Sequence, residues 1–372
     1  MERVNSFSKL SNLVFEASNH YQRLLSIKLR RTKLCVLKKD DWENLCERLN
    51  LYIGSEGIFL SRNLTAYLLG DSKFLHLNLF HEYFGHGLFF EYTKQGKLIE
   101  KLEKRLLKEE MKNFKGKQFT WEELLKFREQ NPNFKLLQKL RNDFLYEIFA
   151  IWTEYYLSEI FNMKTKFEQK YNQIPKEVKD GLEQLINFQK NYGDLALFYH
   201  IGFPKYYDNG RIRNLLKNIF KDKITSAKLV ILYGSRKPYS DIDLFVVSDE
   251  IKDFKNDWLD IYSLTPKEFE YSVSMFRISV TDPLLTGELI MGDKNYFEQK
   301  KRQLQEQPIT QEAIYYNLRK SKEQKILAAQ FPSNSKEYQI GMSYVQTYLK
   351  NALALKQGKK VLTKKALLST VF

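Results

Sequence analysis

Apolar and polar positions divide the chain into a mostly helical first half and a second half that contains short apolar runs. Residues 98–112 have the charged amphipathic pattern of an exposed helix, and residues 133–161 are rich in Leu, Phe, Tyr and Trp, which predicts one long buried helix. Further helices are expected at residues 8–29, 41–49, 74–94, 120–129, 176–190 and 193–200. A strand is expected at residues 32–37, and two short strand-like pieces around Gly54 and Gly57.

The segment Gly202–Gly210 collects Gly, Pro, Asp and Asn and is the best candidate for a domain boundary. After it, the pattern predicts a helix at 211–220 and strands at 228–233, 243–247 and 259–262. From about residue 296 the chain turns helical again, with a break at 331–334. We therefore expect an α+β multidomain protein. Its parts are a mostly helical domain (1–205), an α/β domain (206–298) and a helical C-terminal region (299–372).

Composition is consistent with this division. A chain of 372 residues with 43% hydrophobic and 15% aromatic residues can bury two sizeable cores. Its apolar runs are far shorter than the roughly 18 residues that a membrane-spanning helix needs, and its N-terminus lacks the apolar core of a signal peptide. Cys35 and Cys46 lack metal-type spacing and are expected to be reduced. These features favour a cytoplasmic protein without a membrane partner.

A formal net charge of +15 suits a nucleotide, RNA or an acidic protein as partner. The same abundance of Lys, Asn, Ile, Phe and Tyr also follows from an AT-rich coding sequence. The charge is spread along the chain rather than gathered in one block. Charge therefore supports nucleic-acid binding only weakly.

Two histidines and a carboxylate lie within His81-Glu82-Tyr83-Phe84-Gly85-His86. Imidazole is a usual ligand of zinc, and a catalytic zinc site takes three protein ligands. His81 and His86 are five residues apart, which separates them by about 140° on an ideal α-helix. Both reach one metal only if an extra residue distorts the helix, and Gly85 permits such a bulge. Glu82 is placed to act as a general base.

The third ligand should come from a later helix. Glu147 is the best candidate, because a carboxylate in a strongly apolar helix needs a partner such as a metal. Glu154, two turns further on, could orient a histidine. Asp143, one turn before Glu147, is an alternative ligand.

These residues resemble the dipeptidyl peptidase III family of zinc peptidases. Residues 81–86 match the family's His-Glu-x-x-Gly-His motif in full. Residues 146–151 match its second motif at Glu147 and Ala150. The resemblance implies that His81, His86 and Glu147 bind Zn²⁺ and that Glu82 is the catalytic base.

A second constellation begins at Gly234-Ser235, which leaves an apolar strand where backbone N–H groups can contact a triphosphate. Arg236 and Lys237 follow at once and can neutralise phosphate charge. Asp241 and Asp243 alternate on one strand, so both carboxylates point to the same side and can share Mg²⁺ ions, while Ile242 and Leu244 face the core. Two such ions can activate an attacking oxygen and neutralise a leaving pyrophosphate.

Residues 232–244 resemble the DNA-polymerase-beta-like nucleotidyltransferases, particularly the minimal and aminoglycoside-type members. In that family a third carboxylate lies on a later strand. Asp260 is our choice, which would bind Mg²⁺ and activate the acceptor, and Asp257 is the second choice. Only residues 236–240 separate Gly-Ser from the first Asp, about half the usual spacing.

The sequence thus predicts an Mg²⁺-dependent transfer of a nucleoside monophosphate from a nucleoside triphosphate, ATP by preference, to an acceptor hydroxyl. The acceptor can be a protein, RNA or a small molecule. The transferase domain would be fused to a zinc hydrolase domain. One alternative is a zinc metallopeptidase with a regulatory nucleotide-binding domain. Another is a non-catalytic nucleotide-sensing or antitoxin-like module.

Overall fold

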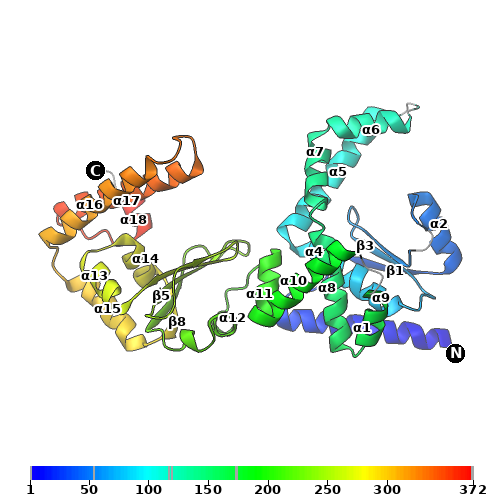
Figure 1. Ribbon diagram of the computed structural model, residues 1–372, viewed down its shortest axis with the longest axis horizontal. Coiled ribbons are helices and arrows are strands. Elements are labelled where there is room, and N and C mark those ends of the chain that lie inside the picture. The colour runs from blue at the N-terminus through cyan, green and yellow to red at the C-terminus, as the bar shows by residue number, and fades with distance from the viewer. Residues whose placement is uncertain (1, 53–54, 116–117, 119, 172–174, 370–372) are drawn as a thin grey trace. The chain divides into compact units, whose positions relative to one another are not determined.

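The computed structural model describes the chain except for residues 1, 53–54, 116–117, 119, 172–174 and 370–372. The chain forms two compact units, Met1–Tyr206 and Tyr207–Phe372 (Figure 1). The division falls inside the segment 202–210, whose Gly, Pro and Asn residues break regular structure. Residues 207–298 and 299–372 belong to the same unit.

Unit 1 is mostly helical with one small sheet. Its helices are α1 (Glu2–Leu25), α2 (Lys39–Leu49), α3 (Leu75–Asn78), the π-helix η1 (Leu79–His86), α4 (Gly87–Tyr92), α5 (Lys94–Phe114), α6 (Trp121–Gln130), α7 (Pro132–Arg141), α8 (Leu145–Ile160), α9 (Lys164–Tyr171), α10 (Lys176–Tyr192) and α11 (Asp194–Ile201). The strands β1 (Lys33–Leu37), β2 (Gly57–Leu60) and β3 (Thr65–Leu69) form a sheet in the order β1-β3-β2. β3 is parallel to β1 and antiparallel to β2, so β2 lies at an edge. The strand expected around Gly54 lies outside the described residues.

The core of unit 1 is centred on η1 and α8, which pack against each other. Phe80 and Phe84 of η1 and Phe149 and Trp152 of α8 are fully buried. Burying an aromatic or aliphatic side chain of this size contributes roughly 1.5–3 kcal/mol. This packing fixes the two helices that carry the predicted zinc ligands.

The single helix expected at residues 133–161 is wrong in one respect, because the chain breaks it into α7 and α8. Phe144 has a φ of 52°, in the left-handed region that ends an α-helix. Asp143 accepts a hydrogen bond from the backbone N–H of Leu145 and so begins α8. Figure 1 shows α5, α6 and α7 side by side, and α8 starts a new direction into the core.

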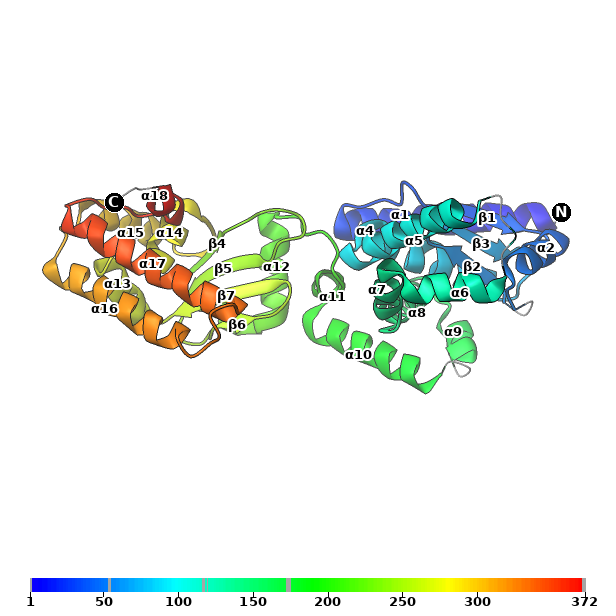
Figure 2. The ribbon, with the colours of Figure 1, turned by 90° about the horizontal axis from the view of Figure 1, so that it is seen from above.

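Unit 2 contains a five-stranded sheet and a set of helices. The strands are β4 (Leu229–Tyr233), β5 (Ile242–Val247), β6 (Phe254–Lys255), β7 (Leu259–Leu264) and β8 (Glu288–Gly292), in the order β6-β7-β5-β4-β8. The helices are α12 (Asn209–Phe220), the 3₁₀-helix η2 (Lys221–Ile224), α13 (Pro266–Ser274), α14 (Ile278–Thr286), α15 (Lys294–Glu306), α16 (Gln311–Ala328), α17 (Lys336–Lys356) and α18 (Lys364–Ser369). Figure 2 shows α16 and α17 as a helical hairpin.

The central strands of this sheet are buried, as their continuous apolar runs predict. Leu229 and Ile231 of β4 and Phe245 and Val247 of β5 belong to one apolar cluster with residues of α13 to α17. β5 is antiparallel to β4 and parallel to β7. The predicted acidic residues therefore lie at one end of two neighbouring buried strands. None of the described helices combines the length and apolar character needed to cross a bilayer.

Candidate functional site

The helical segment that contains His81 and His86 departs from α-helical geometry at these two residues. It is a π-helix over Leu79–His86, between α3 and α4. A π-bulge adds one residue to a helical turn, so the expected distortion is confirmed. As a result the two imidazole rings lie edge to face, with centroids 4.9 Å apart and planes at 86°.

Gly85 allows η1 to approach α8 closely. A Cβ atom at this position would lie 2.6 Å from the Cα of Ala150 and 2.8 Å from its Cβ. Real Cβ atoms essentially never approach that closely, so position 85 must lack a side chain, and Ala150 supplies a small surface opposite it. The two motif residues therefore form one helix–helix contact.

Glu147 of α8 faces both imidazoles. Its Oε1 lies 3.2 Å from Nε2 of His81, and its Oε2 lies 3.5 Å from Nε2 of His86. Two ligand atoms bound about 2.1 Å from a tetrahedral zinc ion lie about 3.4 Å apart. Both distances are close to that value, and each involves a different oxygen of Glu147. Two imidazole nitrogens and one carboxylate also form a donor set that zinc accepts in catalytic sites.

Glu82 adds a fourth group beside the same cluster. Its Oε2 lies 3.8 Å from Nε2 of His86. Among the described residues, His81, Glu82 and His86 are the group whose metal-binding atoms all lie within 4.8 Å of one another. Gly57 of the edge strand β2 packs against Glu82, because a Cβ there would lie 2.9 Å from its Cγ. Glu147 lies within 4 Å of both imidazoles, whereas Glu82 lies within that distance of His86.

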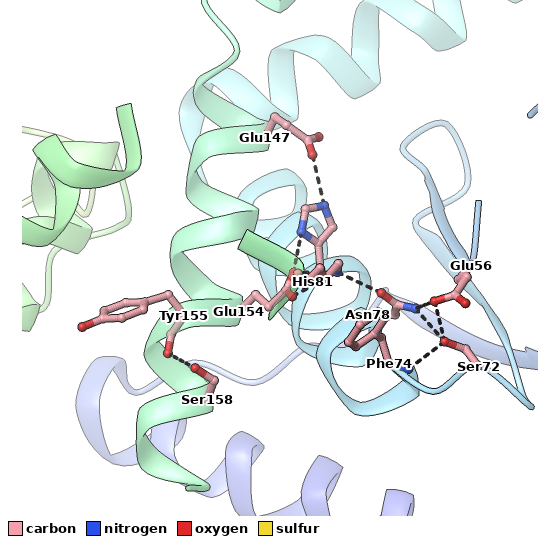
Figure 3. A network of polar contacts seen from close by, with 10 residues as sticks. Glu56, Ser72, Phe74, Asn78, His81, Glu147, Glu154, Tyr155 and Ser158 are labelled. Atoms are coloured by element: carbon pink, nitrogen blue, oxygen red, sulfur yellow. Dashed lines mark hydrogen bonds and ion pairs between the residues drawn. The ribbon is translucent and has the colours of Figure 1, made fainter. Parts of the chain in front are cut away.

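The opposite nitrogen of His81 faces a second carboxylate. Figure 3 shows the His81 ring between Glu147 and Glu154, and Nδ1 of His81 lies 3.2 Å from Oε2 of Glu154. Glu154 is almost fully buried, with 2% of its side chain exposed. It lies where a carboxylate orients a metal-binding histidine, as the sequence suggested.

The pKa values of His81, Glu147 and Glu82 are shifted by one another's charges and by burial. Burial alone would lower the pKa of His81, but the carboxylates of Glu147, Glu154 and Glu82 outweigh it and raise the pKa to about 10. Burial alone would raise the pKa of Glu147, but the two imidazoles hold it well below its usual range. Burial raises the pKa of Glu82, against the opposing effect of the histidines. The carboxylates around His81 therefore favour a cation at this position.

The carboxylate of Asp143, the alternative ligand, makes hydrogen bonds with other groups. It accepts hydrogen bonds from Nε2 of Gln95 at 2.8 Å and from the backbone N–H of Leu145 at 3.1 Å. Nδ1 of His81 and Nδ1 of His86 are both buried, and neither makes a hydrogen bond within the described part of the chain; Nδ1 of His81 has the ion-pair contact with Glu154. The residues at hand fit a zinc ion held by His81, His86 and Glu147.

In unit 2 the register of the sheet brings the predicted carboxylates together. Asp243 of β5 lies directly opposite Asp260 of the parallel strand β7. Tyr233, just before Gly234, lies opposite Asp243 on the other side. Asp257 is exposed and precedes β7, whereas Asp260 lies within that strand. Ile242 and Leu244 are buried, as predicted.

The Gly-Ser turn packs against Asp243. Gly234 has a φ of 75°, and a Cβ on it would lie 2.2 Å from Oδ2 of Asp243, so only glycine fits. The loop that follows is closed by Ser240, whose Oγ donates to the carbonyl oxygens of Ser235 and Lys237, each at 2.8 Å. Tyr207 adds a hydrogen bond to the carbonyl of Lys237. The short loop is therefore a compact turn that needs no further residues.

Asp243 has a perturbed pKa. Burial, together with the nearby carboxylates of Asp260 and Asp241, raises its pKa to about 6. A divalent cation bound among clustered carboxylates stabilises their ionised form. The donor set of three carboxylates suits Mg²⁺.

No pattern in the sequence predicts two of the ion pairs in this region. Lys255 of β6 forms an ion pair with Asp260. Arg236 forms an ion pair with Glu288 of β8, with N and O atoms 2.8 Å apart. Arg236 thus points to a carboxylate that the sequence did not indicate, whereas the side chain of Lys237 is exposed.

Comparison of the sequence with protein-family models and with curated proteins finds no match.

Proposed function

We propose that unit 1 is a zinc-dependent hydrolase that cleaves peptide bonds. One observation carries this proposal: the Nε2 atoms of His81 and His86 face the same carboxylate, Glu147, at 3.2 and 3.5 Å. These distances suit three ligands of one tetrahedral ion. When bound, Zn²⁺ would polarise the substrate carbonyl and lower the pKa of the attacking water.

The residues of the chain supply the rest of the chemistry. His81, His86 and Glu147 hold the metal, and Glu82 beside them accepts the proton of the attacking water and delivers it to the leaving amine. β2 supports a peptide substrate, because it pairs only with β3 among the described strands and its Gly57 packs against Glu82. An extended peptide can add to such an edge through main-chain hydrogen bonds.

Incubation of the zinc-loaded chain with a peptide library tests this proposal. Glu82→Gln keeps the size of the side chain but removes its basicity. We expect it to retain zinc and to lose cleavage by at least a factor of about 100, the lower range for a general base. Cleavage by Glu82→Gln at the wild-type rate would contradict the role of Glu82. Wild-type protein that binds zinc but cleaves no peptide would contradict peptidase activity.

We propose for unit 2 a magnesium-dependent nucleotidyltransferase activity. The pairing of Asp243 with Asp260, next to the Gly234 turn, supports it. Asp241, Asp243 and Asp260 would hold Mg²⁺, and Asp260 would also activate the acceptor hydroxyl. When bound, Mg²⁺ would neutralise the charge that develops on the pyrophosphate.

The turn would bind the triphosphate. The backbone N–H of Gly234 lies in a turn with positive φ, whereas the backbone N–H of Ser235 donates to Asp243. Arg236 can exchange Glu288 for a phosphate at low cost, because both side chains are 43% exposed and such pairs contribute about 0–1 kcal/mol. Lys237 is exposed beside it.

Transfer of label from an α-labelled nucleoside triphosphate tests this second activity. Label on a protein, RNA or small molecule, lost in Asp243→Asn, is the expected result. Nucleotide binding without transfer would favour the alternative of a sensing or antitoxin-like module. Absence of both binding and transfer would contradict the proposal for unit 2.

A further inference from the structure

Lys170 lies beside the zinc centre, although nothing in its local sequence marks it. It is near the end of α9, and 28% of its side chain is exposed. Its Nζ donates to Oδ1 of Asn78 at 2.9 Å and to the carboxylate of Glu154 at 3.0 Å. An ammonium group has three donors, and these contacts use two of them.

The two partners of Lys170 belong to the two helical segments that carry the proposed ligands. Asn78 ends α3 and stands three residues before His81 in the same helical run. Glu154 lies on α8, two turns after Glu147, and faces Nδ1 of His81. One ammonium group therefore joins both helical segments on the side of His81 that faces away from Glu147.

Asn78 is held from its other side as well (Figure 3). Its Nδ2 lies 3.3 Å from Oγ of Ser72 and 3.5 Å from Oε2 of Glu56, and Ser72 donates to Glu56 at 2.7 Å. Asn78 is therefore fixed in an orientation that presents its Oδ1 to Lys170. The contact is part of a built network rather than a chance surface pair.

We propose that Lys170 is a positioning residue of the metal centre. It holds the carboxylate of Glu154 against Nδ1 of His81, so that Nε2 of this ring is directed toward the metal. This inference rests on the proposed zinc site in unit 1. Groups that orient a metal-binding histidine typically account for about 10–100-fold in metal affinity or activity.

A purely structural ion pair is the competing explanation. Removing one partner of a buried pair destabilises the fold, but it leaves the affinity for zinc unchanged if the site does not depend on that pair. Zinc affinity of the folded protein, measured together with the melting temperature, separates the two roles. Protection of the His81 ring N–H from solvent exchange gives a second readout.

The experiment compares the wild-type chain with Lys170→Met, Lys170→Arg and Lys166→Met. Lys166 lies one turn earlier on α9 with an exposed side chain, so Lys166→Met removes the same charge from the same helix. Zinc dissociation constants are measured by competition with a chromophoric chelator, below the melting temperature of each variant. The His81 ring N–H is followed by NMR in the zinc-loaded proteins and assigned with His81→Ala.

We expect Lys170→Met to weaken zinc binding by about tenfold and to speed exchange of the His81 ring proton. Lys170→Arg should recover part of both, because a guanidinium can still donate to Glu154, and Lys166→Met should behave as wild type. Wild-type affinity in Lys170→Met would overturn the positioning role while leaving the zinc site intact. Wild-type protein without zinc would overturn the zinc site itself. If Lys170→Met does not fold, Lys170→Gln provides the same comparison.

Discussion

The contact between Gly85 and Ala150 should make the proposed metal centre sensitive to a single methyl group. In Gly85→Ala the new Cβ would begin 2.6 Å from the Cα of Ala150 and would have to reach about 3.4 Å for ordinary contact. The obstacle is backbone of α8, so no side-chain rotation relieves it. The two helices must therefore separate by about 0.8 Å at this point.

That displacement is large compared with the tolerance of a metal site. Metal–ligand distances are fixed to about ±0.2 Å, and Glu147 lies on α8 less than one turn from Ala150, whereas both histidines lie on η1. Separation of the helices pulls Glu147 away from both imidazoles. We expect Gly85→Ala to lose about 1–3 kcal/mol of stability through overpacking and to weaken zinc binding by at least tenfold.

The assay is a chelator-competition titration of zinc at a temperature where the variant remains folded, with thermal unfolding recorded in parallel. Gly181→Ala is a matched control, because its Cβ would also begin 2.6 Å from a neighbour on α8. That neighbour is the Cδ1 atom of Ile148, the end of a flexible side chain that can move. Gly181→Ala should therefore keep wild-type zinc affinity. Equal zinc affinities of Gly85→Ala and wild type would refute the reasoning.

Three further predictions concern unit 2. Asp241→Asn combined with Asp243→Asn should abolish nucleotidyl transfer and leave the zinc content unchanged, and loss of zinc would contradict two independent sites. The pKa of Asp243 is raised in the folded state to about 6 from its ordinary value of 3.8, so the folded protein binds the extra proton between these values. The stability of the folded protein should fall as pH rises from about 4 to 6 and stay lower above pH 6. In urea unfolding without divalent metal, Asp243→Asn should therefore be more stable than wild type at pH 7.5 but not at pH 4. An equal gain at both pH values would contradict the raised pKa of Asp243. Lys255→Met removes the cation that occupies Asp260, so it should tighten Mn²⁺ binding measured by electron paramagnetic resonance, and weaker or unchanged binding would show that Lys255 does not compete with the metal.

The sequence predicted those parts of the candidate site in unit 1 that depend on local spacing. The spacing of five positions from His81 to His86, with Gly85 before the second, required a helix with an extra residue, and η1 is such a helix. Glu147 could be selected because a carboxylate in an apolar helix needs a partner. These inferences use only the neighbours of each residue along the chain.

The rest of the site depends on contacts between distant segments. Lys170 meets Asn78 across 92 positions of sequence, and Gly57 meets Glu82 from a separate strand. The hydrophobic periodicity of the sequence does not predict contacts between such distant segments. The turn at Phe144 was missed for a different reason, because phenylalanine gives no local signal for a positive φ.

Unit 2 shows the same division. The alternation of Asp241 and Asp243 predicted a strand that carries both carboxylates on one face, but β5 begins at Ile242, one residue after Asp241. Asp260 was chosen because the resembled family has a third carboxylate on a later strand. The ion pairs of Arg236 with Glu288 and of Lys255 with Asp260 join three strands. They depend on the strand order β6-β7-β5-β4-β8, which the sequence pattern does not determine.

The metal content of the purified chain tests the central claim most directly. We predict about one zinc ion per chain in elemental analysis of the wild type and none in the His81→Ala/His86→Ala variant, with both proteins folded by circular dichroism. A wild-type chain that takes up no zinc when zinc is supplied, or a double variant that retains it, would contradict a metal centre at His81, His86 and Glu147.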